Sequence, residues 1–475
     1  MRNVILIFFL MLSVLSPCKA QDFNKVSIEK VIGITKLGIG YEVTGEIDLN
    51  GKTLEIPKES TLSFHGGRII NGTVIFDKTR LEGDVCIDCD IKGTLTNGEI
   101  IVSWFNLRPG VKTDQTKKLQ AILDLYQSNV SDNSWEINLE NPEPIIIIPA
   151  GQYYVRELKL RSYLTIRGAG RGSTVLRGVT FKATRQYNIA IEDISLIGYV
   201  GSTKNSTYDL NNPNHCSAFV LKDCARLIFK NVCVKNYDVA FDNFNTYLVD
   251  YYSCFVSYCR VCYNNCGDGN GLGGHAVRWF GGEMCSSVYG FVQENGNGVL
   301  LKGVTIENCR YGIYCINPTA LTVSVCSCEA NNYDIYGSIT QVNIENNFFS
   351  KSGKIKGDGY IYAPVAIGYT IIQGNTFDQP VYDKPHIIVD DTTEVYSNIL
   401  IGQNFIVNGG RIPVSDRLLP FVVEKGVNRY QTYLPNGNNM LMGQTVIYKD
   451  LQTGDYYLVT RDTEGELLFA PLKKK

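Results

Sequence analysis

Three ionisable side chains recur at similar positions in successive repeats of this sequence: Arg260, Tyr289 and Arg310. If they stand in one column of neighbouring β-strands, about 4.8 Å apart, two guanidinium groups flank one phenol. Nearby cations favour the phenolate and lower a pKa that normally lies near 10. A cation that neutralises a carboxylate and a phenol that takes a proton are what β-elimination beside a carboxylate needs. The alternative is a cation–π stack that only stiffens the sheet.

A second group of polar and aromatic side chains accompanies this column. They are our candidates for contacting a substrate: Asp238, Asp242, Asn264, Asp268, Gln293, Tyr314 and Tyr336. Hydrogen-bonding groups combined with aromatic rings suit a carbohydrate. The alternative is an ordinary solvated sheet surface with pairs between neighbouring strands, such as Asp238 beside Arg260.

Two long irregular segments, residues 198–215 and 264–275, flank these side chains. Long loops without structure of their own are often functional. His275 lies where the second loop returns to the repeats, so we consider it as a competing proton carrier. A lone histidine is, however, more often structural than catalytic.

Other reactions make different demands on the carboxylates. Inverting hydrolysis of a glycoside needs two carboxylates roughly 6.5–9.5 Å apart. Asp238 and Asp242 are four residues apart on one predicted strand, hence about 13 Å apart. Glu294 and Asp268 remain as candidates for a hydrolase. Neighbouring repeats supply no oxygen-rich cluster for calcium, and we expect neither a metal nor another cofactor.

These side chains are placed by a repeat of the chain. Five segments can be aligned with one another: 234–242, 256–264, 285–293, 306–314 and 328–336. In this alignment the apolar inner column is Phe241, Tyr263, Val292, Ile313 and Ile335, and the candidate side chains point outward. A period of roughly 20–30 residues with alternating apolar positions is typical of a solenoid that stacks one coil per repeat.

Upstream of the repeats, residues 113–123 form one predicted amphipathic helix, followed by IIIIPAGQYYV at 145–155 and LTIRGAG at 164–170. This order resembles the start of the pectate-lyase superfamily domain, shared by rhamnogalacturonase-like and epimerase-like proteins and phage tailspikes. The resemblance spans residues 104–405. It implies an all-β fold, a right-handed parallel β-helix whose end is capped by the helix, with a substrate groove on the strand face that carries the candidate columns.

The helix also makes sense physically. The stripe Leu119, Ile122, Leu123 and Tyr126 can cover the exposed β edge of the first coil, and Thr113 or Asp114 is the expected N-cap.

The remaining chain divides by pattern. Residues 1–20 read as a secretory signal peptide cleaved near Ala20, with a lipoprotein signal ending at Cys18 as the alternative. We expect an N-terminal β module at 21–103, the solenoid at 104–415 and a C-terminal β module at 416–475. The protein is then secreted or periplasmic, and no other segment predicts a membrane span.

Composition excludes one class of partner. The chain has 45 basic and 47 acidic residues, and loss of Arg2 and Lys19 with the signal peptide lowers the net charge to about −4. Nucleic-acid binding usually needs a basic excess, so we do not expect it. Most of the 14 cysteines outside the signal peptide are expected to be buried, reduced fillers rather than disulfides.

These observations lead to one functional hypothesis and two alternatives. The hypothesis is a secreted polysaccharide lyase that cleaves a uronate-containing anionic glycan, such as pectin or a glycosaminoglycan, by β-elimination. The alternatives are a glycoside hydrolase on the same fold and a non-catalytic adhesin or tailspike-like binder.

Overall fold

The structure, a computed structural model, describes residues 25–126, 144–199, 216–268, 274–350, 360–378 and 387–407, except 32, 39, 397, 398 and 403, and then residue 418 and five C-terminal strands. The predicted signal peptide and residues 200–215 and 269–273 of the two predicted loops lie outside this range. The chain forms two compact units, residues 1–96 and 97–475.

The first unit is a parallel β module. Its long strand β7 (Arg68–Gly83) pairs in parallel with strands on either side of it in the sequence. The other strands are β1 (Lys25–Ser27), β2 (Ile34–Leu37), β3 (Gly40–Val43), β4 (Glu46–Asp48), β5 (Thr53–Glu55), β6 (Thr61–Phe64) and β8 (Ile87–Leu95), with one 3-10 turn at Ile28–Lys30. Only β2 and β3, of the pairs described here, are antiparallel.

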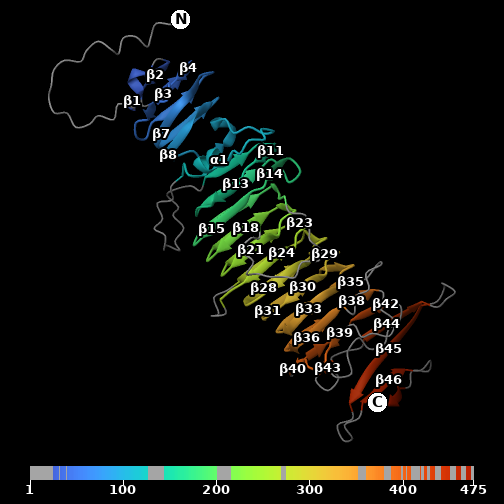
Figure 1. Cartoon of the computed structure of the whole chain (residues 1–475). Helices are drawn as coiled ribbons and strands as arrows, with labels where there is room; N and C mark the ends of the chain where they lie inside the picture. The colour runs from blue at the N-terminus through green and yellow to red at the C-terminus, as the bar shows by residue number, and fades with distance from the viewer. Residues whose placement is uncertain are drawn as a thin grey trace, which may run out of the picture. The chain divides into compact units, whose positions relative to one another are not determined.

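The second unit contains three long sheets, whose strands follow one another in chain order (Figure 1). The 13-stranded sheet consists of β9 (Glu99–Ile101), β10 (Ile145–Ile148), β13 (Leu164–Gly168), β16 (Tyr187–Glu192), β19 (Ala225–Lys230), β22 (Tyr247–Tyr252), β25 (His275–Phe280), β28 (Gly296–Lys302), β31 (Pro318–Ser324), β34 (Val342–Glu345), β37 (Thr370–Gln373), β41 (Ile399–Ile401) and β43 (Val422–Glu424).

The 15-stranded sheet follows it in each coil. Its strands are β11 (Gly151–Tyr154), β14 (Thr174–Arg177), β17 (Ser195–Ile197), β20 (Cys233–Lys235), β23 (Phe255–Ser257), β26 (Glu283–Cys285), β29 (Thr305–Glu307), β32 (Ser327–Glu329), β35 (Phe348–Ser350), β38 (Thr376–Asp378), β42 (Phe405–Val407), β44 (Asn428–Tyr433), β45 (Met440–Lys449), β46 (Tyr456–Arg461) and β47 (Leu467–Pro471). The last four strands pair antiparallel, unlike the parallel strands before them.

The 11-stranded sheet closes the coil. It contains β12 (Glu157–Lys159), β15 (Thr180–Thr184), β18 (Ser217–Lys222), β21 (Val239–Phe244), β24 (Val261–Cys266), β27 (Tyr289–Gln293), β30 (Tyr311–Cys315), β33 (Tyr333–Thr340), β36 (Ile361–Gly368), β39 (Ile387–Val389) and β40 (Glu394–Val395). Three parallel sheets visited in turn by every coil form a parallel β-helix, which confirms the predicted fold class.

Apolar rings fill the space between the sheets. Phe241 is stacked on Phe219 with ring centroids 4.8 Å apart, and Tyr251 is stacked on Trp279 at 4.4 Å. All four side chains are fully buried. Side chains of consecutive coils therefore stack into one continuous core, as the repeat predicts.

The predicted helix is present but begins later than expected. Helix α1 (Thr116–Leu123) follows a 3-10 turn at Val102–Phe105, and Leu119, Ile122 and Leu123 are buried as predicted. Its N-cap residue is Gln115, not Thr113 or Asp114. The Asp114 carboxylate still accepts the backbone N–H of Thr116 at 2.9 Å, so it satisfies one of the free donors of the first turn.

No helix in the described part of the chain is long and apolar enough to cross a membrane. All 14 described cysteines are free thiols, and Cys86 is the exposed one among them.

Candidate functional site

Six tyrosines gather on one side of the 11-stranded sheet, on strands β27, β30, β33 and β36. We call this set the tyrosine face: Tyr289, Tyr311, Tyr314, Tyr333, Tyr336 and Tyr362. Tyr289, Tyr311 and Tyr333 are register partners in one column. Tyr314, Tyr336 and Tyr362 form the second column.

Most neighbouring rings within each column stack on one another, whereas Tyr336 and Tyr362 meet edge to face. The centroids of Tyr311 and Tyr333 are 5.6 Å apart at 12°, and those of Tyr314 and Tyr336 are 5.4 Å apart at 16°. Stacked neighbours cover each other's ring faces, which leaves the edges and hydroxyl groups for a ligand. Apart from Tyr289, these side chains are half-buried. The face therefore offers rows of phenol hydroxyls rather than open platforms for sugar rings.

Burial raises the pKa of two phenols of this face. Partial burial, with a further contribution from neighbouring tyrosines, raises the pKa of Tyr314 and Tyr336 above the usual value of a phenol. At neutral pH these groups are hydrogen-bond donors. Tyr362, at the far end of the second column, donates to Asp390 with O–O distances of 2.9 and 2.7 Å.

The predicted Arg260–Tyr289–Arg310 column is wrong by one position. Tyr289 pairs with Val261 and Tyr311, so both arginines lie one position earlier in their strands. The residue equivalent to Phe241 and Tyr263 is Phe291, not Val292, because the chain needs one position fewer between these two repeats than the alignment assumed. Val292, not Gln293, then occupies the outer column beside Tyr314.

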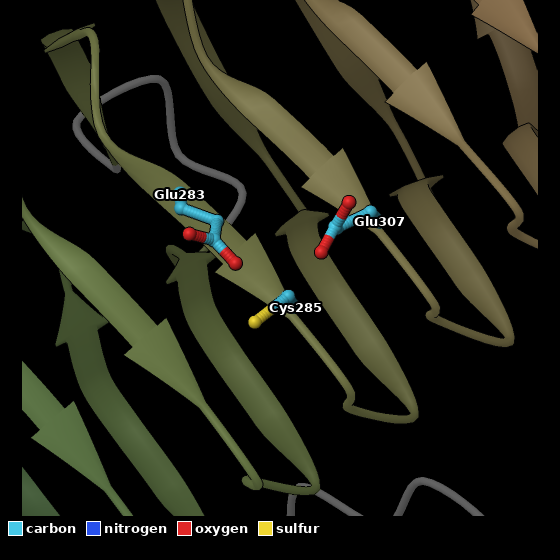
Figure 2. Close-up of side chains that lie close together, drawn as sticks. All are labelled: Glu283, Cys285 and Glu307. Atoms are coloured by element: carbon cyan, nitrogen blue, oxygen red, sulfur yellow. The ribbon is translucent and has the colours of Figure 1, made fainter.

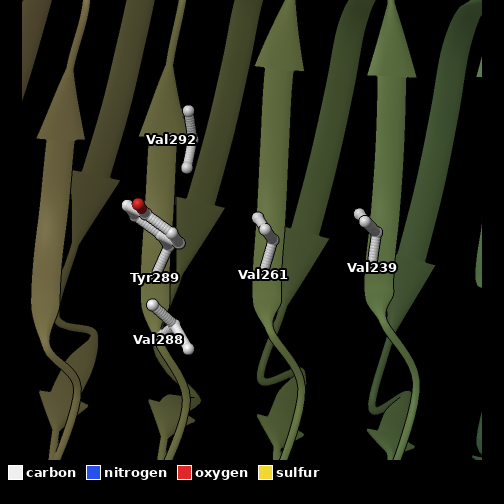
Figure 3. Close-up of a cluster of buried hydrophobic side chains, with 5 residues drawn as sticks. All are labelled: Val239, Val261, Val288, Tyr289 and Val292. Atoms are coloured by element: carbon white, nitrogen blue, oxygen red, sulfur yellow. The ribbon is translucent and has the colours of Figure 1, made fainter. Parts of the chain in front are cut away.

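Tyr289 lies in a closed apolar environment. It packs in a cluster with Val239, Val261, Val288 and Val292, on the side of the sheet turned away from the strands behind (Figure 3). Its side chain is 7% exposed and its ring is stacked on that of Tyr311. These surroundings do not suit the predicted role of Tyr289 as a base that reaches a substrate.

The two arginines have different surroundings. Arg260 is 5% exposed and forms two hydrogen bonds of 2.7 Å to the two carboxylate oxygens of Asp238. This bidentate pair neutralises both charges inside the protein. Arg310 is exposed, and its guanidinium carbon lies 5.2 Å from the centroid of the Tyr311 ring. Arg310 is therefore the one of the pair that a ligand can reach.

Two of the predicted substrate contacts are buried. Asn264 is fully buried and donates to Asp242 at 2.9 Å. Gln293 faces the interior, where its side-chain oxygen accepts a hydrogen bond from Asn265 at 2.9 Å. A Cβ on Gly296 would lie 2.1 Å from the Gln293 side chain, so the chain must pass closely around this amide. Neither Asn264 nor Gln293 is available to a ligand.

The remaining candidates lie at the corner that leads from the 11-stranded to the 13-stranded sheet. Asp268 is exposed there, and its backbone N–H donates to Asn245 at 3.1 Å. His275 begins β25 and pairs with Tyr247, so it belongs to a different sheet from Tyr289. Burial raises the pKa of the Glu294 carboxyl above its ordinary value.

Asp242 and Glu294 share a neighbour at this corner. Burial raises the pKa of the Cys266 thiol to about 12, and the negative charges of Asp242 and then Glu294 add to the rise. The charges of both carboxyl groups therefore act on one thiol. Sequence reasoning named both residues but did not place them together.

Three members of the tyrosine face were not among the predicted contacts: Tyr311, Tyr333 and Tyr362. The signal was present, because the word YGIY at 311–314 returns as YDIY at 333–336 with a tyrosine at each end. The alternation rule for a straight strand gives the two tyrosines of one word opposite faces. In the structure they meet on one face, with the Tyr311 and Tyr314 centroids 5.5 Å apart.

A group that could hold a metal lies on a different sheet. Glu283, Cys285 and Glu307 place ligand atoms within 4.8 Å of one another on β26 and β29 (Figure 2). No group of three metal-ligating residues on the tyrosine face meets the same spacing among the described residues.

Comparison with known proteins identifies no family for this chain. No protein-family profile and no curated protein matches the chain. Similar solved structures include PfbA, a surface adhesin of Streptococcus pneumoniae, with 12% identity and a TM-score of 0.47 over 79% of this chain and 99% of that one. The family 28 exopolygalacturonase of Yersinia enterocolitica has 12% identity and a TM-score of 0.47, covering 71% and 77%. The A-module of the mannuronan C-5 epimerase AlgE4 of Azotobacter vinelandii has 14% identity and a TM-score of 0.43, covering 69% and 100%.

Proposed function

We propose that this protein binds a polysaccharide along the tyrosine face and acts on it there. The observation that carries the proposal is the repetition of phenol groups on consecutive coils, β30, β33 and β36. Neighbouring coils are about 4.8 Å apart, so a linear polymer lying along the columns meets the same hydroxyl groups again and again. The predicted resemblance of residues 104–405 to the pectate-lyase superfamily favours the same class of ligand.

The reaction that we propose is β-elimination on a uronate residue. Arg310, one of the two cations predicted from the sequence, provides the positive charge, and Tyr311 provides the phenol in place of Tyr289. In this scheme Arg310 neutralises the uronate carboxylate, and Tyr311 acts as a phenolate that takes the proton from C5. The electron pair of that C–H bond forms the C4–C5 double bond, the C4–O bond breaks, and the leaving oxygen receives the proton back from the Tyr311 hydroxyl.

Hydrolysis is a second candidate, supported by Glu294. A carboxyl group whose pKa is raised by burial stays protonated closer to neutral pH, as a general acid requires. The partner carboxylate in this alternative is Asp242, whose charge acts on the same Cys266 thiol.

One set of assays distinguishes these proposals. The protein is incubated with pectins and glycosaminoglycans, and the ultraviolet absorbance of unsaturated uronates is followed together with the release of reducing ends. Unsaturated ends mean elimination, reducing ends alone mean hydrolysis, and binding without either means a non-catalytic binder.

Variants then test the tyrosine face itself. Tyr333→Phe removes one hydroxyl and keeps the ring, so glycan affinity should fall about tenfold, the equivalent of one hydrogen bond of about 1.4 kcal/mol. Arg310→Ala should abolish elimination, whereas Glu294→Gln should abolish hydrolysis only. Tyr252→Phe is the matched control, because Tyr252 is 39% exposed and lies on the 13-stranded sheet. Equal binding by Tyr333→Phe and Tyr252→Phe would exclude the tyrosine face as the binding surface.

A further inference from the structure

Glu283, Cys285 and Glu307 form a compact group on the 15-stranded sheet, away from the tyrosine face. Glu283 and Cys285 lie on β26, and Glu307 on β29 is the register partner of Cys285. Their three ligand atoms lie within 4.8 Å of one another, and all three residues are half-buried. In Figure 2 the Glu283 carboxylate is directed toward Cys285, and Glu307 extends from the neighbouring strand.

The charge balance of this group differs from that of other half-buried acids in the solenoid. Elsewhere an arginine on a neighbouring coil pairs with such an acid, as in Arg260–Asp238, Arg278–Asp250 and Arg167–Glu192. Within the described residues, no Lys, Arg or His forms an ion pair with Glu283 or Glu307.

The imbalance extends over a third coil. Glu329 on β32 is the register partner of Glu307, and in the same described part of the chain it too has no ion pair with a basic residue. Like charges on adjacent strands repel one another. A cation between them removes this cost, and none of the ion pairs among the described residues supplies one.

We propose that Glu283, Cys285 and Glu307 bind a divalent transition-metal ion of the zinc type. One sulfur and two carboxylate oxygens are a donor set that suits Zn²⁺, whereas Ca²⁺ takes six to eight oxygens and no thiol. Bonds of about 2.0–2.3 Å to a tetrahedral ion require donors roughly 3.5 Å apart. The donors here lie within 4.8 Å of one another, little more than this spacing. Water or a further ligand takes the fourth position.

This site joins two coils. Because β26 supplies two ligands and β29 supplies the third, the ion links consecutive turns of the solenoid across the sheet. An ion that binds only the folded state raises the free energy of unfolding. The inference is independent of the proposed polysaccharide activity.

The test uses the full chain, purified with a chelator and a thiol reductant and then freed of the chelator. Titration with Co²⁺ should give one bound ion per chain with a sulfur-to-metal charge-transfer band, and Zn²⁺ should displace the Co²⁺ and raise the melting temperature. Cys285→Ser and Glu307→Gln should each weaken binding about tenfold or more. Circular dichroism confirms that each variant is folded before titration.

Cys86→Ser is the matched control, because Cys86 is an exposed thiol in the first unit. It should bind like the wild type. Three results overturn the proposal: no bound Co²⁺ or Zn²⁺, loss of binding in Cys86→Ser equal to that in Cys285→Ser, or Ca²⁺ binding as tight as Zn²⁺ binding and unchanged by Cys285→Ser. The last result would show that the column of acids binds any divalent cation and has no selectivity for zinc-type ions.

Discussion

Asp238 and Arg260 form a bidentate ion pair between two consecutive coils. The side chains are 16% and 5% exposed, and each carboxylate oxygen accepts a hydrogen bond of 2.7 Å. Asp238→Asn keeps the shape and removes the charge, which leaves a buried guanidinium without its carboxylate. We expect the free energy of unfolding to fall by about 3–5 kcal/mol in urea titrations followed by circular dichroism.

The control for this prediction is an exposed pair on the same sheet. Lys182 and Glu157 are 2.7 Å apart, with side chains 45% and 49% exposed. Breaking that pair with Glu157→Gln should cost at most about 1 kcal/mol. Equal losses in the two variants would mean that the Asp238–Arg260 pair is not protected from solvent.

Glu294 gives a prediction about pH. Burial raises its pKa in the folded protein, so the charged carboxylate is less stable there than in the unfolded chain. The contribution of the Glu294 carboxyl group to the free energy of unfolding is fully present below its unfolded-state pKa of about 4.3. This contribution is lost as the pH rises through the folded-state pKa. Glu294→Gln cannot ionise, so it should melt at a higher temperature than the wild type near pH 7. Melting curves near pH 4 should show that this advantage has disappeared.

Single-residue placement is where the sequence was least informative. The repeat assigned the tyrosines to the correct sheet, but the step from Tyr263 to Phe291 was aligned one position too long. The alignment therefore put Tyr289 level with Arg260 and Arg310, where the structure has Val288. At the position of Tyr263 the sequence alignment gave Val292, and the structure has Phe291. Matching Phe291 to the buried rings Phe241 and Tyr263 would have selected the correct one.

At the scale of one strand, Gly337 controls how closely two coils approach. Its φ is +114°, and a Cβ there would lie 2.0 Å from the carbonyl oxygen of Cys315 on the neighbouring coil. Gly337→Ala must therefore push β33 away from β30, and we expect a clear fall in the urea midpoint. Gly298→Ala is the control, because its φ is +67° and the nearest atom to its Cβ is 3.9 Å away. That change should cost only about 1–2 kcal/mol for the left-handed backbone.

The capping helix shows which element-scale features a sequence can predict. The apolar stripe at Leu119, Ile122 and Leu123 fixed the existence and the buried side of α1. The start of the helix was less certain, because Asp114 can accept a backbone N–H from just outside the first turn as well as from the N-cap position. Contacts with the first coil support the helix: the Gln120 side-chain oxygen accepts the Lys159 N–H at 2.7 Å.

For the whole molecule, the repeat predicted a solenoid because every coil must satisfy the same pairing and bury the same inner column, and the resemblance of residues 104–405 to the pectate-lyase superfamily made it a β-helix. The division of the chain was harder to obtain from patterns. The compact units meet at residue 96, and the short strand β9 pairs with β10 in the second unit. A strand of three residues is too short to show an alternating sequence pattern, so the sequence does not indicate to which unit β9 belongs.

The parallel register of the second unit also determines how it yields to force. Val239 is the register partner of Val261 in a parallel strand pair, and Tyr289 is that of Tyr311. The strands of one coil are therefore hydrogen-bonded mainly to the coils directly before and after it in the chain. A chain pulled from one end of such a stack loses one layer of bonds before the next is loaded. Each rupture then frees one coil of about 22 residues, or about 75 Å of extended chain at roughly 3.4 Å per residue. The solenoid is thus a tether that lengthens one coil at a time, with longer increments at the coils that lead from Phe181 to Phe219 and from Tyr263 to Phe291.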